Sequence, residues 1–479
     1  MTVGFSPVAG RDRIEAMDVI RGFALLGIAL MNVEFFNRPL AALGDGLPTG
    51  LEGADAWAAL AIHLFVRDKF FTIFSILFGM GFALMLARAQ AAGRHFTTPY
   101  LRRTVALALF GLVHGMLIWA GDILLSYASA AAVLLAVLLG RGWMMWVAFA
   151  LLIAVGFAFN LPEDAGFTAF LLLIDALVLT WFRRGAAAGS LALQGRNLMK
   201  AGLTLYLLPA VLLALLGGIQ WRAEAARAVA PVAQMSTEET KARAEGERRM
   251  KEALRQQAQQ AGMEASVMTR GSYADAVKFR APHFIADFTR AIFFVPMAMG
   301  LFMIGAWLLR SGAVNEPLQH LGLLRAWAWI ALPAGLLTTL ASAMIATDPG
   351  SGQARWMTAG GLQLIGSLPM ALGYLALLLL ALQRQSWRRG LGWLAPAGRM
   401  ALTNYIGQSV LCSLFFFGYG LGFWGMPRAQ QVLFVLGMFV LQVLLSRWWL
   451  TRFRFGPLEW LWRWATYGVR PVMRQAARA

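Results

Sequence analysis

A histidine inside an apolar segment is the residue of this chain best suited to chemistry. His114 lies in the stretch 101–120, which is long enough and apolar enough to cross a bilayer. A titratable imidazole at that depth costs free energy unless a partner or a wet cavity compensates it, so it marks a candidate functional site. There it can act as a general base toward an acceptor hydroxyl or amine, or as a nucleophile that accepts an acyl group.

Asp122 is the candidate partner of this histidine. It follows eight residues later in the sequence, directly after Gly121. On a straight helix this separation corresponds to about 12 Å of rise, which is too far for contact. Contact therefore requires the chain to fold back near the glycine. The alternative is that His114 bonds a backbone carbonyl or a polar side chain of a neighbouring helix and only helps to hold the bundle together.

An acidic and a basic residue open the first apolar segment. Asp18 and Arg21 are three residues apart, so they share a helix face and can pair. Arg21 can bind a phosphate of a cytoplasmic donor, because a guanidinium binds such groups in a fork. The alternative is a structural ion pair at the membrane boundary. Glu34, near the other end of the same segment, is a further candidate acid or base.

Four more polar residues are candidate ligand contacts. His63 lies in the short apolar stretch 56–67, and Lys69 opens the next apolar segment. Asn404 and Gln408 are four residues apart on one helix face, where they can line a cavity for sugar or lipid head-group hydroxyls. The alternatives are an ordinary interfacial histidine, a lysine that extends to the membrane surface, and amides that bond across helices.

Composition identifies the class of protein that must position these residues. The chain has 479 residues, of which 59% are hydrophobic and 14% are charged, against about 25% charged residues in soluble domains. The net charge of +18 is spread between apolar segments and forms no basic tail, so we expect no nucleic-acid partner. The single cysteine, Cys412, excludes an intramolecular disulfide, and we find no metal-ligand spacing.

The apolar segments predict an all-α, polytopic integral membrane bundle with about twelve transmembrane spans. The stretch 56–67 is too short to span and is expected to be an interfacial or re-entrant helix. The expected spans are about 17–36, 68–87, 102–120, 123–140, 143–160, 165–182, 200–220, 288–309, 323–346, 358–382, 400–422 and 430–450.

Positive charge predicts the orientation of the bundle. Arginines concentrate in alternate loops and at both ends of the chain, which places both termini in the cytoplasm. We expect an N-terminal membrane half (1–220), an external helical insert (221–287) and a C-terminal membrane half (288–479). The run Ser236-Thr237-Glu238-Glu239 is typical of a capping box and predicts a helix start within the insert.

Several motifs resemble those of the YeiB-like bacterial membrane proteins. The first segment reads D-x-x-R-G-x-A-L-x-G-I-x-L-x-N from Asp18 to Asn32. The C-terminal stretches 398–409 (GRMALTNYIGQS) and 456–463 (GPLEWLWR) are similar to that family's C-terminal domain, and 70–82 and His114 with 121–124 also fit. The resemblance covers nearly the whole chain apart from 221–287 and implies the inner membrane of a bacterium.

The same opening is distantly similar to heparan-α-glucosaminide N-acetyltransferase and to bacterial membrane O-acyltransferases, which move an acyl group from a cytoplasmic donor to an acceptor across the membrane. The O-acyltransferase histidine, ten residues beyond the arginine, corresponds to Asn32 here. The N-acetyltransferases share this asparagine as a candidate substrate contact, but their histidine corresponds to Leu43. His63 or His114 would have to take its place.

The resemblance therefore implies an acyltransferase with no permanently bound cofactor and with acyl-CoA as a possible donor. Its partners would be membrane lipids and an acceptor that is a small molecule, a lipid or a glycan. A transporter or flippase, in which the same polar residues line a pathway, is the alternative function. A third possibility is a scaffold in which these residues are structural. The sequence gives no indication of the oligomeric state.

Overall fold

Helices dominate the described structure. The computed structural model describes residues 14–40, 50–159, 162–184, 193–229, 237–346 and 352–475. Within these ranges no β-strand occurs, and the only β-type pairing is an isolated bridge between Phe453 and Arg474. The predicted all-α class is confirmed.

The elements of the first half of the chain are α1 (Glu15–Asn32), the 3-10 turn η2 (Val33–Phe36), α2 (Gly53–Phe65), α3 (Lys69–Ala91), α4 (Thr97–Val113), the π-helical turn η4 (His114–Ile118), α5 (Leu124–Leu139), α6 (Gly142–Phe159), α7 (Pro162–Phe182) and α8 (Gly195–Val229). The second half contains α9 (Thr237–Arg270), α10 (Tyr273–Arg290), η6 (Ala291–Phe293), α11 (Phe294–Arg310), η7 (Pro317–His320), α12 (Leu321–Ala326), the π-helical turn η8 (Trp327–Ala331), α13 (Leu332–Ala346), α14 (Gln353–Ala381), α15 (Gln385–Leu391), η9 (Gly392–Leu394), α16 (Ala395–Arg399), α17 (Ala401–Phe416), α18 (Arg428–Arg452) and α19 (Pro457–Tyr467).

Among the described residues, seven helical stretches are long and apolar enough to cross a membrane, and four shorter apolar helices accompany them. A helix lies at each of the expected spans, so the prediction of a polytopic helical membrane protein is confirmed. The exact number of spans and the cytoplasmic position of the termini stay predictions. Helix α2 has 13 residues and a length of about 20 Å, too short to cross alone.

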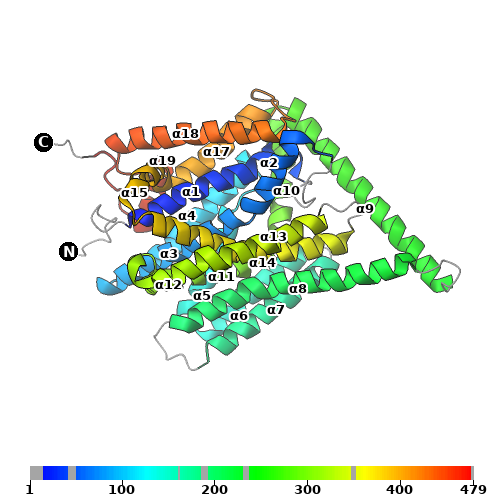
Figure 1. Cartoon of the computed structure of the whole chain (residues 1–479), viewed down its shortest axis with the longest axis horizontal. Helices are drawn as coiled ribbons and strands as arrows, with labels where there is room; N and C mark the ends of the chain where they lie inside the picture. Colours follow the sequence, from blue (N-terminus) through cyan, green and yellow to red (C-terminus); the bar gives the residue numbers. More distant parts are fainter. Residues whose placement is uncertain are drawn as a thin grey trace.

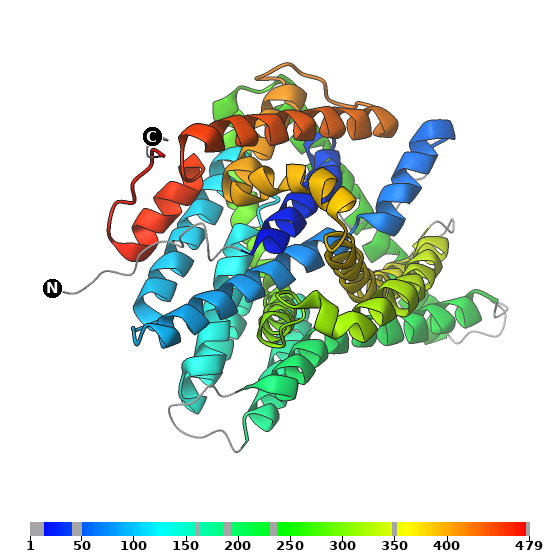
Figure 2. The same cartoon turned by 60° about the vertical axis from the view of Figure 1, so that its left-hand side comes forward.

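The helices run side by side as a bundle, with the start of α1 and the ends of α18 and α19 at one end and α9 at the other (Figure 1). Helix α1 lies among α3, α16, α17 and α18 near the middle of the bundle (Figure 2). Helix α9 begins at Thr237, as the capping-box pattern predicts, although Ser236 itself lies outside the described residues. Helix α10 returns from α9 and packs against the π-helical turn at the end of α4.

Close approach of α3 and α11 sets the centre of the core. A Cβ atom on Gly79 would overlap the carbonyl of Phe302, and one on Gly305 would overlap the carbonyl of Ile76. Glycines on both helices therefore let the two backbones touch, which is typical of helix packing in membranes. This pair holds α3 in place, and α3 forms one wall of the site described next.

Candidate functional site

A deep cavity of about 570 Å³ is enclosed by α1, α3, α4, α5, α17 and α19. Its wall on α3 extends from Phe74 to Arg88. The helical rise between these two residues is about 21 Å, so the cavity reaches through much of the bundle. It therefore connects one end of the bundle with its interior.

The mouth of the cavity is basic. Six arginines and two carboxylates line it: Asp18, Arg21, Arg88, Arg94, Arg103, Arg399, Glu459 and Arg463. They belong to the start of α1, the end of α3, the start of α4 and the segments around α16 and α19, which share one end of the bundle (Figure 1). Six guanidinium groups at one mouth favour a ligand with phosphate or carboxylate groups, because a guanidinium can donate two parallel hydrogen bonds to such a group.

The predicted pair of Asp18 and Arg21 is part of this mouth. Arg21 Nη1 donates to Asp18 Oδ1 at 2.9 Å and lies 3.5 Å from the carbonyl oxygen of Gly398. Asp18 is 5% exposed, and both side chains line the cavity. The ion pair and the proposed contact with a ligand are therefore compatible, because the pair forms part of the cavity wall.

Helix α19 closes the mouth from the side. Glu459 accepts hydrogen bonds from the backbone N–H groups of Leu402 and Thr403, at 2.6 and 3.1 Å, and from the Thr403 hydroxyl at 2.6 Å. Burial raises the pKa of Glu459 above its ordinary value, and these hydrogen bonds oppose that shift. Glu459, on α19, thus accepts hydrogen bonds from backbone N–H groups at the N-terminus of α17 that have no acceptor within that helix.

Two residues that sequence reasoning did not assign to a site meet at this closure. The Arg103 guanidinium lies 4.2 Å from the ring centroid of Trp462, and Trp462 Nε1 donates to the Arg103 carbonyl oxygen at 2.9 Å. This cation–π contact anchors α19 to α4 and keeps a guanidinium in the cavity wall. Neither residue carries a local signal in the sequence, since they are brought together only by the docking of α19.

The inner end of the cavity is apolar and aromatic. It is lined by Ile28, Phe74, Ile123, Leu124, Tyr127 and Tyr405. The Tyr127 hydroxyl lies 2.8 Å from Ser75 Oγ and 3.2 Å from the Phe71 carbonyl oxygen, which fixes its ring against α3. The ring of Tyr405 lies 5.1 Å, centroid to centroid, from the imidazole of His114. Tyr405 therefore lines the inner end of the cavity and lies against the imidazole of His114.

His114 and Asp122 are in direct contact. Nδ1 of His114 lies 2.8 Å from Oδ1 of Asp122, and both side chains are 0% exposed. An ionised carboxylate only accepts hydrogen bonds, so Nδ1 is the donor of this bond, and in the neutral imidazole Nε2 then keeps its lone pair. Within the described structure, Nε2 is buried and has no hydrogen-bond partner.

The chain folds back to make this contact, as the sequence required. Helix α4 ends at Val113, His114 opens the π-helical turn, and Trp119 is extended at φ −157° and ψ 125°. Asp122 then accepts the N–H of Leu125 through its second oxygen at 2.9 Å, at the start of α5. A Cβ atom on Gly111 would meet the Asp122 carboxylate and the backbone of Leu125, so this glycine makes room for the turn. π-Helical turns of this kind are frequent at functional sites.

Aromatic and basic side chains pack around the π-helical turn that His114 opens. The ring of Trp119 stacks on Phe36 at 4.4 Å, and Phe284 of α10 packs against Gly115. Arg280 Nη1 donates to the carbonyl oxygen of Leu117 at 2.7 Å, which satisfies a backbone group at the end of the turn. Helix α10 thus packs against the turn that carries the histidine.

The other predicted site residues lie apart from this pair. Glu34 forms ion pairs with Arg38, at 2.6 Å, and with Arg428 at the start of α18. Asn32 ends α1 and is half-buried. These contacts join η2 to α18, and the role of Glu34 as an acid or base stays a prediction.

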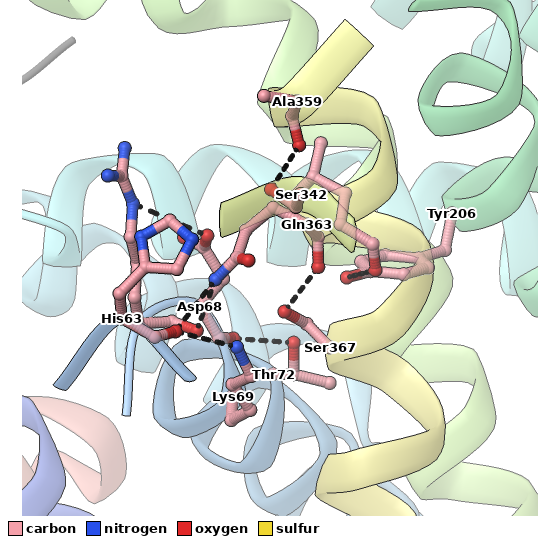
Figure 3. Close-up of polar contacts among 11 residues, drawn as sticks. His63, Asp68, Lys69, Thr72, Tyr206, Ser342, Ala359, Gln363 and Ser367 are labelled. Atoms are coloured by element: carbon pink, nitrogen blue, oxygen red, sulfur yellow. Dashed lines mark hydrogen bonds and ion pairs between the residues drawn. The ribbon is translucent and has the colours of Figure 1, made fainter. Parts of the chain in front are cut away.

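Asn404 and Gln408 face α18. Asn404 Nδ2 donates to Ser446 Oγ at 2.9 Å, and Gln408 Nε2 donates to Gln442 Oε1 at 2.9 Å. Gln442 Nε2 returns a bond to the Asn404 carbonyl oxygen at 3.1 Å. These bonds match the alternative of amides that join two helices, and a ligand-binding role for them stays a prediction. His63 and Lys69 form a separate cluster at the junction of α2 and α3, shown in Figure 3.

Comparison with known proteins finds bacterial relatives that cover almost the whole chain. A family model described as "Protein of unknown function (DUF418)" matches residues 308–469. The chain is 29% identical to the "Uncharacterized protein YxaH" of Bacillus subtilis (strain 168), over 96% of this chain and 96% of the relative. It is 28% identical to the "Uncharacterized protein YeiB" of Escherichia coli (strain K12), over 98% and 100%. No solved structure matches the chain, and these names assign no activity.

Proposed function

Since the chain is similar over almost its whole length to relatives whose names give no activity, we propose a function from the geometry of its site. We propose that it is a transmembrane acyltransferase of the bacterial inner membrane. The donor, an acyl-CoA, would bind in the cavity with its phosphates at the basic mouth. The acceptor, a small molecule, lipid or glycan with a hydroxyl or amine, would react at His114.

The observation that carries the proposal is the buried pair of His114 and Asp122 beside the inner end of a basic-mouthed cavity. Asp122 holds the imidazole in the tautomer whose Nε2 can accept a proton. The same division of roles, in which a buried carboxylate orients a histidine base, recurs in enzymes that transfer acyl groups.

In the proposed reaction, Nε2 of His114 takes the proton of the acceptor hydroxyl or amine. The acceptor oxygen or nitrogen forms a bond to the thioester carbon, and the carbon–sulfur bond breaks. The thiolate that leaves takes the proton from the imidazolium, so the products are the acylated acceptor and free CoA. The ring returns to its starting state, and Asp122 stays ionised throughout.

The test is acyl transfer by the purified protein in lipid nanodiscs. Radiolabelled acetyl-CoA is supplied with a panel of hydroxyl and amine acceptors and with bacterial lipid extract, and labelled product is measured. We expect transfer by the wild type and loss of transfer in His114→Gln, with donor binding retained, because glutamine keeps hydrogen-bonding capacity but is no base. His283→Gln, an exposed histidine on α10, is the matched control. Equal transfer by the wild type and His114→Gln would refute the catalytic role.

Transport is the second candidate function. Its specific support is the break between α2 and α3 within one apolar stretch, because discontinuous helices are typical of secondary transporters. A transporter that uses His114 only as a contact would keep most of its flux in His114→Gln. Absence of acyl transfer from several acyl-CoA donors, together with uptake or lipid movement by proteoliposomes, would favour this function.

A further inference from the structure

A break interrupts the apolar stretch Gly53–Ala91. Helix α2 ends at Phe65 and α3 begins at Lys69. Between them Asp68 adopts φ 63°, in the left-handed region that residues other than glycine rarely occupy. Irregular backbone at membrane depth is tolerated where protein covers it or where it lines a polar site. The break is therefore a place to look for a ligand.

Side chains from two helices satisfy the carbonyl groups that the break exposes. The carbonyl oxygen of His63 accepts from Lys69 Nζ at 3.1 Å and from Gln363 Nε2 at 3.2 Å. Gln363 Nε2 also lies 3.3 Å from the carbonyl oxygen of Arg67. Figure 3 shows these groups converging from α2, α3 and α14, with Thr72 and Ser367 beside them.

The charge of Lys69 has no carboxylate bonded to it within the described structure. Lys69 is 0% exposed, and its Nζ has one hydrogen-bond acceptor, an uncharged carbonyl. The neighbouring carboxylate of Asp68 lies 3.8 Å from Arg67 Nε and also attracts the Lys69 ammonium, so one anion is shared between two cations. The break thus holds two cations and one anion. A buried charge is normally paired, because its removal from water is costly.

Two further polar groups at the break lack partners within the described structure. Neither Nδ1 nor Nε2 of His63 has a hydrogen bond, although the residue is 5% exposed. Oε1 of Gln363 is also buried without a donor. Buried polar atoms of native proteins are almost always bonded, and exceptions call for a specific explanation such as a ligand. The imidazole can donate one N–H bond, and the ammonium has N–H bonds to spare.

We propose that this break is a binding site for a small monovalent anion, held between the Lys69 ammonium and a ring N–H of His63. The anion supplies the missing negative charge. A halide or the carboxylate of a small solute meets this requirement. A hydroxyl on the solute would also provide a donor for Gln363 Oε1, so a hydroxy acid should bind more tightly than chloride or acetate.

Access to the site is provided by its two charged neighbours. The side chains of Arg67 and Asp68 are 23% and 30% exposed, so the break reaches the surface beside them. An anion can replace part of its hydration shell with the Arg67 guanidinium before it moves to the buried Lys69 ammonium. The proposal does not depend on acyl transfer, since none of these residues lines the basic-mouthed cavity.

The experiment measures thermal unfolding of the whole protein in nanodiscs with sodium chloride, sodium acetate or sodium glycolate, at constant ionic strength set with sodium sulfate. Binding to the native state should raise the Tm in a saturable manner. We expect glycolate to saturate at the lowest concentration. Lys69→Met should abolish the shift, whereas Lys200→Met, at an exposed lysine on α8, should keep it. An equal shift in Lys69→Met, or no saturable shift with any of the three salts, would overturn the proposal.

Two gentler variants keep the test decisive if Lys69→Met does not fold. Lys69→Arg retains the charge and should retain a saturable shift. His63→Leu removes the ring donor, and the loss of one hydrogen bond to a charged group should weaken binding about tenfold. Wild-type affinity in His63→Leu would exclude the imidazole from the site, and loss of the shift in the charge-retaining Lys69→Arg would show that positive charge does not hold the anion.

Discussion

Replacement of Asp122 by asparagine tests the proposed mechanism at its most sensitive point. The amide has nearly the same shape as the carboxylate, and its oxygen can still accept the N–H of Leu125. Its nitrogen, however, can only donate toward His114 Nδ1. The imidazole must then carry its proton on Nε2, and the lone pair that would serve as the base is lost. The equivalent change in a serine-protease triad lowers kcat about 10⁴-fold.

We therefore expect Asp122→Asn to lower the rate of acyl transfer on the order of 10³–10⁴-fold. Its stability should fall little, since both hydrogen bonds are replaced. Asp122→Ala is the contrasting variant, because it leaves the Leu125 N–H and His114 Nδ1 buried without partners. At about 1–3 kcal/mol for each such group, it should cost roughly 2–6 kcal/mol of stability.

The assay combines transfer from radiolabelled acetyl-CoA with thermal unfolding in nanodiscs. His114→Gln combined with Asp122→Asn should be no slower than the slower single variant, because the two side chains act as one unit. A rate for Asp122→Asn within about tenfold of the wild type would refute the tautomer argument. A large loss of stability in Asp122→Asn, with the activity of the remaining folded protein intact, would assign the pair a structural role.

Three further predictions concern the cavity and the orientation. Tyr405→Ala should speed the modification of His114 by diethyl pyrocarbonate, detected by mass spectrometry, whereas Tyr405→Phe should react at the wild-type rate, since the ring of Tyr405 lies against the imidazole at the inner end of the cavity; an unchanged rate in Tyr405→Ala would refute this placement. Arg21→Lys should weaken binding of CoA about tenfold or more, measured by calorimetry, because a point charge cannot replace the guanidinium fork; unchanged affinity would leave Arg21 with only its ion-pair role. In a Cys412→Ala background, an impermeant thiol reagent added outside cells should label a cysteine at the exposed position Gln259 and spare one at Gln90, which is also exposed; the reverse pattern would invert the predicted orientation.

The helical class and the approximate positions of the spans could be predicted because they follow from local composition. Long apolar runs need their backbone groups satisfied in lipid, and a helix does this within each run. The sequence indicated the break between α2 and α3 only through the stretch 56–67, which is too short to span a membrane. The partners of its exposed carbonyl groups could not be predicted, because Gln363 of α14 comes from far along the chain.

The contact between His114 and Asp122 could be predicted only on the condition that the chain folds back between them. Their spacing excluded contact on a straight helix, and the glycine indicated that a turn was possible. The structure meets the condition by a π-helical turn followed by extended backbone at Trp119, together with the space left by Gly111. Such a departure from helical rise has no clear sequence signal.

Other parts of the site had weaker or unused signals. Glu34 and Arg38 are four residues apart, and this spacing alone predicts the ion pair that the structure contains. Arg103 and Trp462 lie far apart in the sequence, and sequence patterns assigned neither of them to the site. Their contact depends on how α19 docks, which local patterns do not specify.

The separation of charge along the cavity favours group transfer over passage of the ligand. Its charged residues lie at the mouth, and its inner end is apolar and aromatic. A phosphate held by guanidinium groups such as Arg21 and Arg103 would lose those partners and its hydration on moving inward, at a cost of several kcal/mol. A neutral arm attached to that phosphate meets no such barrier and can extend along the roughly 21 Å of α3 toward Tyr405. The phosphates of such a donor would stay at the mouth while only its uncharged acyl group approaches His114. Acyl transfer requires this arrangement, whereas transport of the anion would not need it.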